Sequence, residues 1–253
     1  MGIFEHYQSR YEERKQEEFT IGEFLEICKE DQTAYANAAE RLLQAIGEPE
    51  LIDTANDPAL SRIFSNRVIS RYPAFSEFYG MEEAIEQIVS YLKHAAQGLE
   101  EKKQILYLLG PVGGGKSSLA ERLKELMQHV PIYMLKGSPV NDHPFCLFDV
   151  KEDGDILQKE YGIPKRYLKT IMSPWARKRL HEFNGDITQF KVVRVYPSVL
   201  DQVGIAKTEP GDENNQDISS LVGKVDIRRL EQYAQNDPDA YSYSGSLCKA
   251  NQG

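Results

Sequence analysis

One stretch limits what this chain can fold into more than any other part of its sequence. Gly110-Pro111-Val112-Gly113-Gly114-Gly115-Lys116-Ser117 fits the phosphate-binding pattern G-x-x-x-x-G-K-[ST] at every defined position. In proteins this pattern joins the end of a β-strand to the start of an α-helix, so the flanking segments test it. The stretch therefore predicts a nucleotide-binding α/β domain built around this loop.

The segments on both sides of the loop agree with that context. Residues 104–109 form an apolar run of strand length, which predicts a β-strand. Residues 118–127 repeat apolar side chains at helical spacing, which predicts an α-helix. A glycine-rich turn with a chance lysine would not have both flanks of the right type. We therefore expect a P-loop.

The residue types of the loop suit a polyphosphate. Glycines at 113, 114 and 115 allow backbone conformations closed to other residues, so successive N–H groups can point toward phosphate oxygens. Lys116 is expected to reach the β and γ phosphates and neutralise their charge, and the Ser117 hydroxyl to ligate Mg²⁺. The following helix adds its positive dipole end. The expected ligands are ATP and Mg²⁺, bound by Gly110, Pro111, Val112, Gly113, Gly114, Gly115, Lys116, Ser117 and Ser118.

Net charge, cysteine spacing and hydropathy indicate which partners and which cellular compartment to expect. A net charge of −9 opposes polyanions, so nucleic acid is not an expected partner. Cys28, Cys146 and Cys248 lie far apart, without the spacing of a disulfide framework or a zinc site, which favours a reducing cytoplasm. No apolar run reaches membrane-spanning length, so no membrane partner is expected.

Helical patterns ahead of the loop predict a small N-terminal helical domain over residues 1–74. Thr20 and Glu23 have the spacing of a capping box in front of an amphipathic segment. The P-loop domain is expected over residues 75–253. Within it, a stretch at about 145–245 departs from a repeating strand–helix pattern and is interpreted as an inserted segment.

Other segments carry predictions of single elements. The charged stretch 5–18 predicts a solvated helix or a mobile arm. Residues 130–135 and 191–196 predict strands. Residues 81–96 predict a helix that leads to the P-loop strand.

The aromatic run that ends at Gly80 has two interpretations. Phe78, Tyr79 and Gly80 stand at the expected joint between the domains. Aromatic residues at such a joint form ordinary interdomain core, or they flank the adenine of a nucleotide held by the nearby loop.

Hydrolysis on a P-loop also needs an acidic residue at the end of a second strand. The only local candidate is Asp149, which ends the apolar run 145–148 but has no adjacent second acid. The Walker B acids are therefore expected to be absent from the chain. Either the protein is a nucleotide-dependent switch, or the chain stops before the second motif.

A family resemblance favours the second explanation. Three parts of the chain resemble the PrkA family of bacterial serine protein kinases, which carry an AAA+ ATPase domain: the P-loop with Phe78-Tyr79-Gly80-Met81 ahead of it, residues 216–227, and residues 237–253. The last two also resemble a wider AAA+ branch in which a Leu-x-Gly-x-x-Asp loop and a Gly-x-Leu-x-x-Ala-Asn-x-Gly turn precede the Walker B strand. By this resemblance, residue 253 falls immediately before that strand.

The resemblance implies a P-loop AAA+ core, truncated before Walker B, in a protein that forms a homo-oligomeric ring at full length. It implies ATP-dependent phosphorylation of serine in protein substrates in a stress or starvation setting. The chain itself lacks the G-x-G-x-x-G, H-R-D-x-x-x-x-N and D-F-G motifs of ordinary protein kinases. An AAA+ protease or remodeller and a nucleotide-gated scaffold without catalysis therefore stay open. For residues 1–253 alone, we expect nucleotide binding without appreciable turnover.

Overall fold

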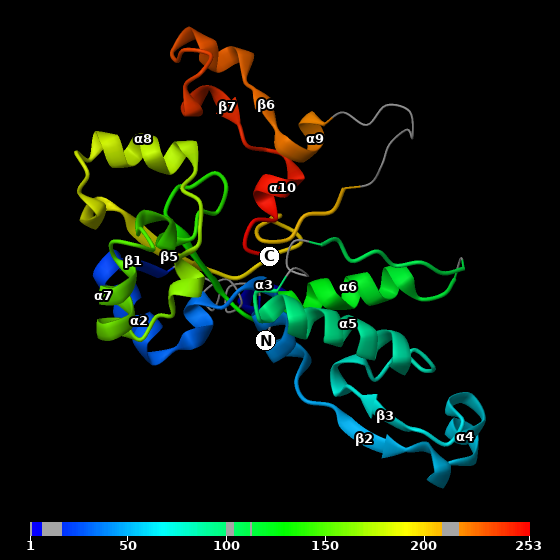
Figure 1. Ribbon diagram of the computed structural model, residues 1–253. Helices are drawn as coiled ribbons and strands as arrows, with labels where there is room; N and C mark the ends of the chain where they lie inside the picture. The colour runs from blue at the N-terminus through cyan, green and yellow to red at the C-terminus, as the bar shows by residue number, and fades with distance from the viewer. Residues whose placement is uncertain (1, 7–16, 100–103, 112, 209–217) are drawn as a thin grey trace. The chain divides into compact units, whose positions relative to one another are not determined.

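The fold was analysed in a computed structural model, which describes residues 2–6, 17–99, 104–111, 113–208 and 218–253 (Figure 1). Its contacts group the chain into two compact units. The first, here called the sheet unit, comprises residues 1–36 and 131–253, and the second, the loop unit, comprises residues 37–130. Helices and small sheets occur together, so the fold is mixed α/β as expected.

The sheet unit is organised by a three-stranded antiparallel sheet in the order β1-β5-β4. Strand β5 (Lys191–Val195) lies in the centre, with Phe19 opposite Val192 on one side and Met134 opposite Val193 on the other. Strands β4 (Ile132–Leu135) and β5 confirm the two strand predictions. Of the segment 5–18, for which a helix or arm is predicted, residues 5 and 6 are helical and residues 7–16 lie outside the described part. Strand β1 (Glu17–Thr20) corrects the prediction at residues 17 and 18.

A layer of aromatic side chains fills the core of the sheet unit. Helix α2 (Ile21–Glu30) starts with the predicted capping box, in which Thr20 Oγ1 accepts from the Glu23 backbone N–H and Glu23 accepts from the Thr20 N–H. The box fixes the start of the helix, so that its apolar face, including Phe24, packs against the sheet. The Phe24 and Phe145 rings are fully buried, with centroids 5.7 Å apart.

The described residues of the loop unit form two strands and four α-helices. Strands β2 (Glu50–Asp53) and β3 (Val68–Arg71) form an antiparallel hairpin, joined through α4 (Pro58–Phe64), as Figure 1 shows. Helices α3 (Ala38–Ile46), α5 (Glu82–Ala96) and α6 (Lys116–Met127) pack together. Helix α5 confirms the helix predicted over 81–96, and α6 confirms the helix predicted after the loop.

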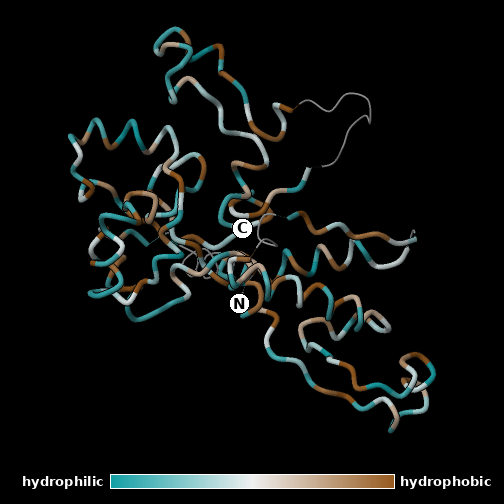
Figure 2. Tube along the Cα trace, in the orientation of Figure 1, coloured by the Kyte–Doolittle hydropathy of each residue, from teal (hydrophilic) through white to brown (hydrophobic). Residues whose placement is uncertain are grey.

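The apolar run ahead of the loop does not form the predicted strand. Residues 105–110 are not part of any helix or strand, and the Ile105 and Leu109 side chains are 90% and 79% exposed. Figure 2 shows this run in brown, as hydrophobic sequence. A strand requires a hydrogen-bonded neighbour, and no strand of the described residues pairs with it. The local sequence is of strand type, but its pairing partner is missing.

The remaining elements lie in the sheet unit. They are α7 (Gly154–Tyr161), α8 (Pro174–Glu182), α9 (Ser219–Val222), β6 (Lys224–Val225), β7 (Tyr241–Ser242) and α10 (Ser246–Lys249), and β6 pairs with β7 in a short antiparallel hairpin. The division into domains 1–74 and 75–253 stays a prediction, because compact units of contacts and inherited domains need not coincide. In the described ranges, every helix is too short or too polar to cross a bilayer.

Candidate phosphate-binding site

The loop between residue 110 and α6 has the backbone that the sequence predicts for a P-loop. Gly113 and Gly115 have φ angles of 79° and 75°, in the left-handed region that favours glycine. A Cβ at position 114 would stand 3.1 Å from the Pro111 carbonyl oxygen. All three glycines therefore serve the curvature of the loop. Val112, a predicted member of the site, lies outside the described residues.

Lys116, the predicted phosphate-binding lysine, folds over the loop. Its Nζ donates hydrogen bonds to the carbonyl oxygens of Gly110 at 2.7 Å and Pro111 at 2.5 Å. An ammonium group has three donors, so one remains for an anion above the loop. The loop thus holds its own cation in place, beside the backbone that would surround a phosphate.

Helix α6 starts at the loop without a side-chain cap. Gly115 is its N-cap residue, and the first intrahelical bond runs from the Leu119 N–H to the Gly115 carbonyl at 2.8 Å. The N–H groups of the first turn have no intrahelical acceptor and carry the positive end of the helix dipole. Ser117 and Ser118 lie in this turn, and both are exposed. The start of α6 can therefore receive a phosphate.

The donor set fits Mg²⁺ in the way P-loop sites use it. Mg²⁺ usually keeps several waters and takes one or two protein ligands together with phosphate oxygens. The exposed Ser117 hydroxyl offers one such ligand next to Lys116. Among the described residues, no cluster of three His, Cys, Asp or Glu side chains could hold a metal ion by itself. Phosphate oxygens would have to supply the rest.

Two contacts join the loop and its helix to the segment between β3 and α5. The Sδ atom of Met81 would lie 3.0 Å from a Cβ at position 115, so Met81 packs directly on that glycine. The Arg122 Nε of α6 donates to the Ala74 carbonyl at 2.8 Å. The residues proposed to flank an adenine therefore belong to a segment that touches the phosphate loop.

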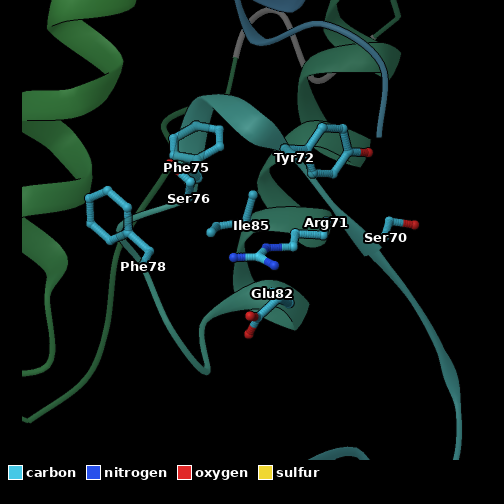
Figure 3. Close-up of a pocket in the computed structure, with 8 residues that line it drawn as sticks. All are labelled: Ser70, Arg71, Tyr72, Phe75, Ser76, Phe78, Glu82 and Ile85. Carbon is cyan, nitrogen blue, oxygen red and sulfur yellow. The ribbon is translucent and has the colours of Figure 1, made fainter. Parts of the chain in front are cut away.

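The structure separates the three predicted adenine-flanking residues. Phe78 lines a small pocket that is partly open to solvent and has a cavity volume of about 10 Å³, enough for about one water molecule. Tyr79 is 81% exposed, and Gly80 makes a turn with a φ angle of 75°. Figure 3 shows the pocket, which is lined by Ser70, Arg71, Tyr72, Phe75, Ser76, Phe78, Glu82 and Ile85. Apart from Phe78, sequence reasoning missed these residues, because they come from β3, the turn after it and the start of α5, and share no motif.

Asp149 does not occupy the position of a strand-ending acid. The run before it forms a 3₁₀-helix (Pro144–Leu147) in place of a strand. The Asp149 carboxylate accepts hydrogen bonds from the backbone N–H groups of Lys151 at 2.7 Å and Glu152 at 3.3 Å. Its role is to cap the turn before α7, which corrects its candidacy as a catalytic acid.

Cys28 and Cys146 are core residues, whereas Cys248 is only partly buried. Burial raises the pKa of the Cys146 thiol to about 12, with a further contribution from the nearby Asp142 carboxylate, and it raises the pKa of the Cys28 thiol as well. A nucleophilic cysteine needs a lowered pKa. Neither Cys28 nor Cys146 therefore has the lowered thiol pKa of a nucleophilic cysteine.

Comparison with known proteins identifies the family. A family model described as the PrkA AAA domain matches residues 19–253. The chain belongs to this family. The PrkA resemblance noted in the sequence is thereby confirmed. No solved structure matches the chain.

Two curated relatives carry different names. The chain is 77% identical to the serine/threonine kinase YeaG of Escherichia coli strain K12, over all of this chain and 40% of the relative. It is 33% identical to the ATP-dependent protease PrkA of Bacillus subtilis strain 168, over 96% of this chain and 37% of the relative. The chain thus spans about two fifths of the length of these relatives. Both are named as enzymes, and the second name states ATP dependence.

Proposed function

We propose that this chain binds ATP and Mg²⁺ through the loop at 110–118 and that it is the ATP-binding AAA+ part of a PrkA-like serine protein kinase. The observation that carries the proposal is the loop itself. Its glycines curve the backbone, Lys116 lies over it, and α6 starts from it without a side-chain cap. In this proposal, Lys116 neutralises the phosphate charge and Ser117 contributes one ligand to Mg²⁺.

The whole protein's activity is proposed from the relatives. In a kinase, the γ-phosphoryl group passes from ATP to a serine Oγ of the protein substrate, ADP leaves, and the hydroxyl proton passes to a base. The similarity to YeaG, named a serine/threonine kinase, supports this activity. A stress response, a cytoplasmic location and a homo-oligomeric ring belong to the same proposal. For residues 1–253 we propose binding without appreciable turnover.

A second candidate is an ATP-dependent protease, because the Bacillus subtilis relative carries that name. ATP labelled in the γ-phosphate separates the two in a protein that includes this chain and the remaining length of its relatives. Label transferred to a serine of a protein substrate supports the kinase. Cleavage of the substrate with only free phosphate released supports the protease. If neither occurs but a partner binds only with nucleotide, the nucleotide-gated scaffold is the better description.

A further inference from the structure

The phosphate loop takes its shape from bonds within itself. The Gly114 N–H donates to the Pro111 carbonyl at 3.1 Å. Lys116 Nζ donates to the same carbonyl and to that of Gly110. Bonds between such near neighbours curve the loop, but they do not fix its place in the loop unit. Because the run 105–110 ahead of it belongs to no strand, the loop is oriented by α6 and by the segments that touch it.

Met81 makes one such contact. Its Sδ and Cε atoms stand 3.0 and 3.6 Å from the position that a Cβ would take at residue 115. Gly115 is the N-cap residue of α6, with φ 75° and ψ 1°, in the left-handed region. Methionine is flexible and polarisable, so its side chain fills irregular gaps of this kind. Met81 thus covers the residue at which the loop becomes a helix.

Contacts of its own hold Met81 in place. It is the N-cap residue of α5, and its carbonyl accepts a hydrogen bond from the N–H of Ile85, which is buried. The segment that leads to it is tied to α6 a second time, because Arg122 Nε donates to the Ala74 carbonyl at 2.8 Å. Arg122 lies about two helical turns beyond Gly115. This segment and α6 are therefore joined at Met81 and again at Ala74, which fixes Met81 relative to the loop.

The backbone next to this contact is the part that would surround a phosphate. The N–H groups of the first turn of α6 have no intrahelical acceptor. Their direction follows from the conformation of Gly115, where the turn begins. Backbone that must first be ordered costs conformational entropy, whereas a site already held in its bound geometry binds more tightly. A side chain that keeps Gly115 in its left-handed conformation therefore favours phosphate binding.

From these observations we infer that Met81 is a positioning residue of the phosphate site: its thioether holds Gly115 in place and so aligns the N–H groups of the loop with the phosphates. The inference rests on the proposed nucleotide binding and adds to it a residue outside the P-loop pattern. Met81 acts through backbone that every polyphosphate would contact. Its effect should therefore be the same for ligands with a base and without one.

The test compares ATP with inorganic tripolyphosphate, both with Mg²⁺, by isothermal titration calorimetry at a temperature where circular dichroism shows each variant folded. Met81→Ala should weaken the binding of both ligands by the same factor of about three to ten, because backbone of the loop must then be ordered on binding. Met81→Leu, similar in volume, should stay within about twofold of wild type. Met81→Val removes the atoms that touch Gly115 but keeps a larger side chain than alanine, so it replaces Met81→Ala if that variant does not fold.

The matched control is Met127→Ala. Met127 is the last residue of α6 and is buried, so its truncation leaves a cavity and should lower the melting temperature. Both affinities should stay at the wild-type value, because the contact at Gly115 is kept. The control therefore separates a loss of stability from a loss of loop position.

The outcomes separate this inference from the proposed function. If Met81→Ala leaves both affinities unchanged, or lowers the affinity for ATP alone, Met81 does not position the loop, and the inference is overturned. An equal loss in Met127→Ala also overturns it, since the effect would then be general destabilisation. If tripolyphosphate binds wild type but not Lys116→Ala, the phosphate site stands whatever the Met81 variants show. If Lys116→Ala binds both ligands as wild type does, both proposals fail.

Discussion

Both compact units have buried apolar side chains, but the apolar run ahead of the phosphate loop is an exception within the loop unit. In the sheet unit, Phe24, Phe145 and Val192 are fully buried between α2, the sheet and the segments after it. In the loop unit, the apolar run ahead of the phosphate loop is exposed along most of its length. In the sheet unit, the aromatic core is formed by residues of that unit itself. The loop unit carries the candidate phosphate loop after a segment that pairs with no strand of the described residues. A motif can therefore keep its local geometry where the sheet expected around it is not formed.

The largest effect should come from a core aromatic of the sheet unit. Phe145→Ala should lower the free energy of unfolding of this unit by about 3–5 kcal/mol, because it leaves a cavity where the ring was fully buried. Urea unfolding followed by the fluorescence of Trp175, the single tryptophan, measures this, since Trp175 packs against the same core.

The matched change in the loop unit is Leu109→Ala. Its side chain is 79% exposed, so the change should stay within about 0.5 kcal/mol. Hydrogen exchange in the loop unit measures it locally. A cost as large as that of Phe145→Ala would mean that the run is buried, and the contrast between the units would disappear.

The next effect concerns binding alone. Lys116→Ala should weaken ATP binding by about tenfold to a hundredfold or more, because it removes a charged donor from the phosphate site. Isothermal titration calorimetry measures the affinity, and circular dichroism should show an unchanged fold. Lys93→Ala, at an exposed lysine of α5, is the control. Equal affinity of wild type and Lys116→Ala would refute the assignment of the site.

A smaller effect should follow from the backbone of the loop. Gly115→Ala forces a Cβ into the left-handed region and against the Met81 sulfur, which should destabilise the loop unit by about 1–2 kcal/mol. Gly22→Ala is the matched control in the sheet unit, because that glycine lies in α2 with open space around it. It should stabilise by about 0.5–1 kcal/mol through the unfolded state. Thermal denaturation of both variants shows whether each change raises or lowers the stability. If Gly22→Ala destabilised the protein while Gly115→Ala had no effect, the left-handed backbone and close packing described for Gly115 would be contradicted.

The smallest effect should be electrostatic and lies in the sheet unit. Lys178 of α8 donates to Asp237 at 2.8 Å and Asp239 at 2.6 Å. The hydrogen bond from Lys178 lowers the pKa of Asp237, and the bonds to Asp237 and Asp239 raise the pKa of Lys178. The ion pairs of Lys178 should therefore stabilise this unit fully above pH about 4, the pKa of an aspartate in the unfolded chain. This stabilisation should be lost as pH falls through the lowered pKa of Asp237. It should also be lost at high pH, as pH rises through the raised lysine pKa.

Trp175 lies on the same helix and reports on these ion pairs. Its fluorescence, recorded against pH for wild type and Asp237→Asn, measures the change. The variant should have a weaker acid-dependent step, because only Asp239 remains to pair with Lys178. Identical profiles would show that the contact contributes nothing to the pH dependence of this unit.

Local sequence was enough for the features that depend on neighbours in the chain. The Thr20–Glu23 capping box and the glycines of the loop were predictable because each is decided within a few residues. The loop was predictable for the same reason, and it carries the proposed phosphate chemistry.

Other features were not predictable because they depend on partners far along the chain. The run before the loop has strand composition, but a strand exists only with a hydrogen-bonded neighbour. The apolar residues 145–148 have the composition of a strand that would end at Asp149. They lie instead in and after a 3₁₀-helix (Pro144–Leu147), where Phe145 fills the core of the sheet unit. Because this run is not a strand, Asp149 follows a 3₁₀-helix, and its carboxylate accepts hydrogen bonds from the turn before α7.

The sequence by itself determined the phosphate loop, its lysine and the helix that starts behind it, because these need only short-range geometry. It also carried enough resemblance to indicate the PrkA family. Only the tertiary structure brought Arg71, Phe78 and Glu82 to one pocket and packed Met81 on the loop. Those residues come from a strand, a turn and a helix start, and no local pattern relates them. Their proximity arises from hydrogen bonds and packing between elements, which fix distances that sequence spacing does not encode.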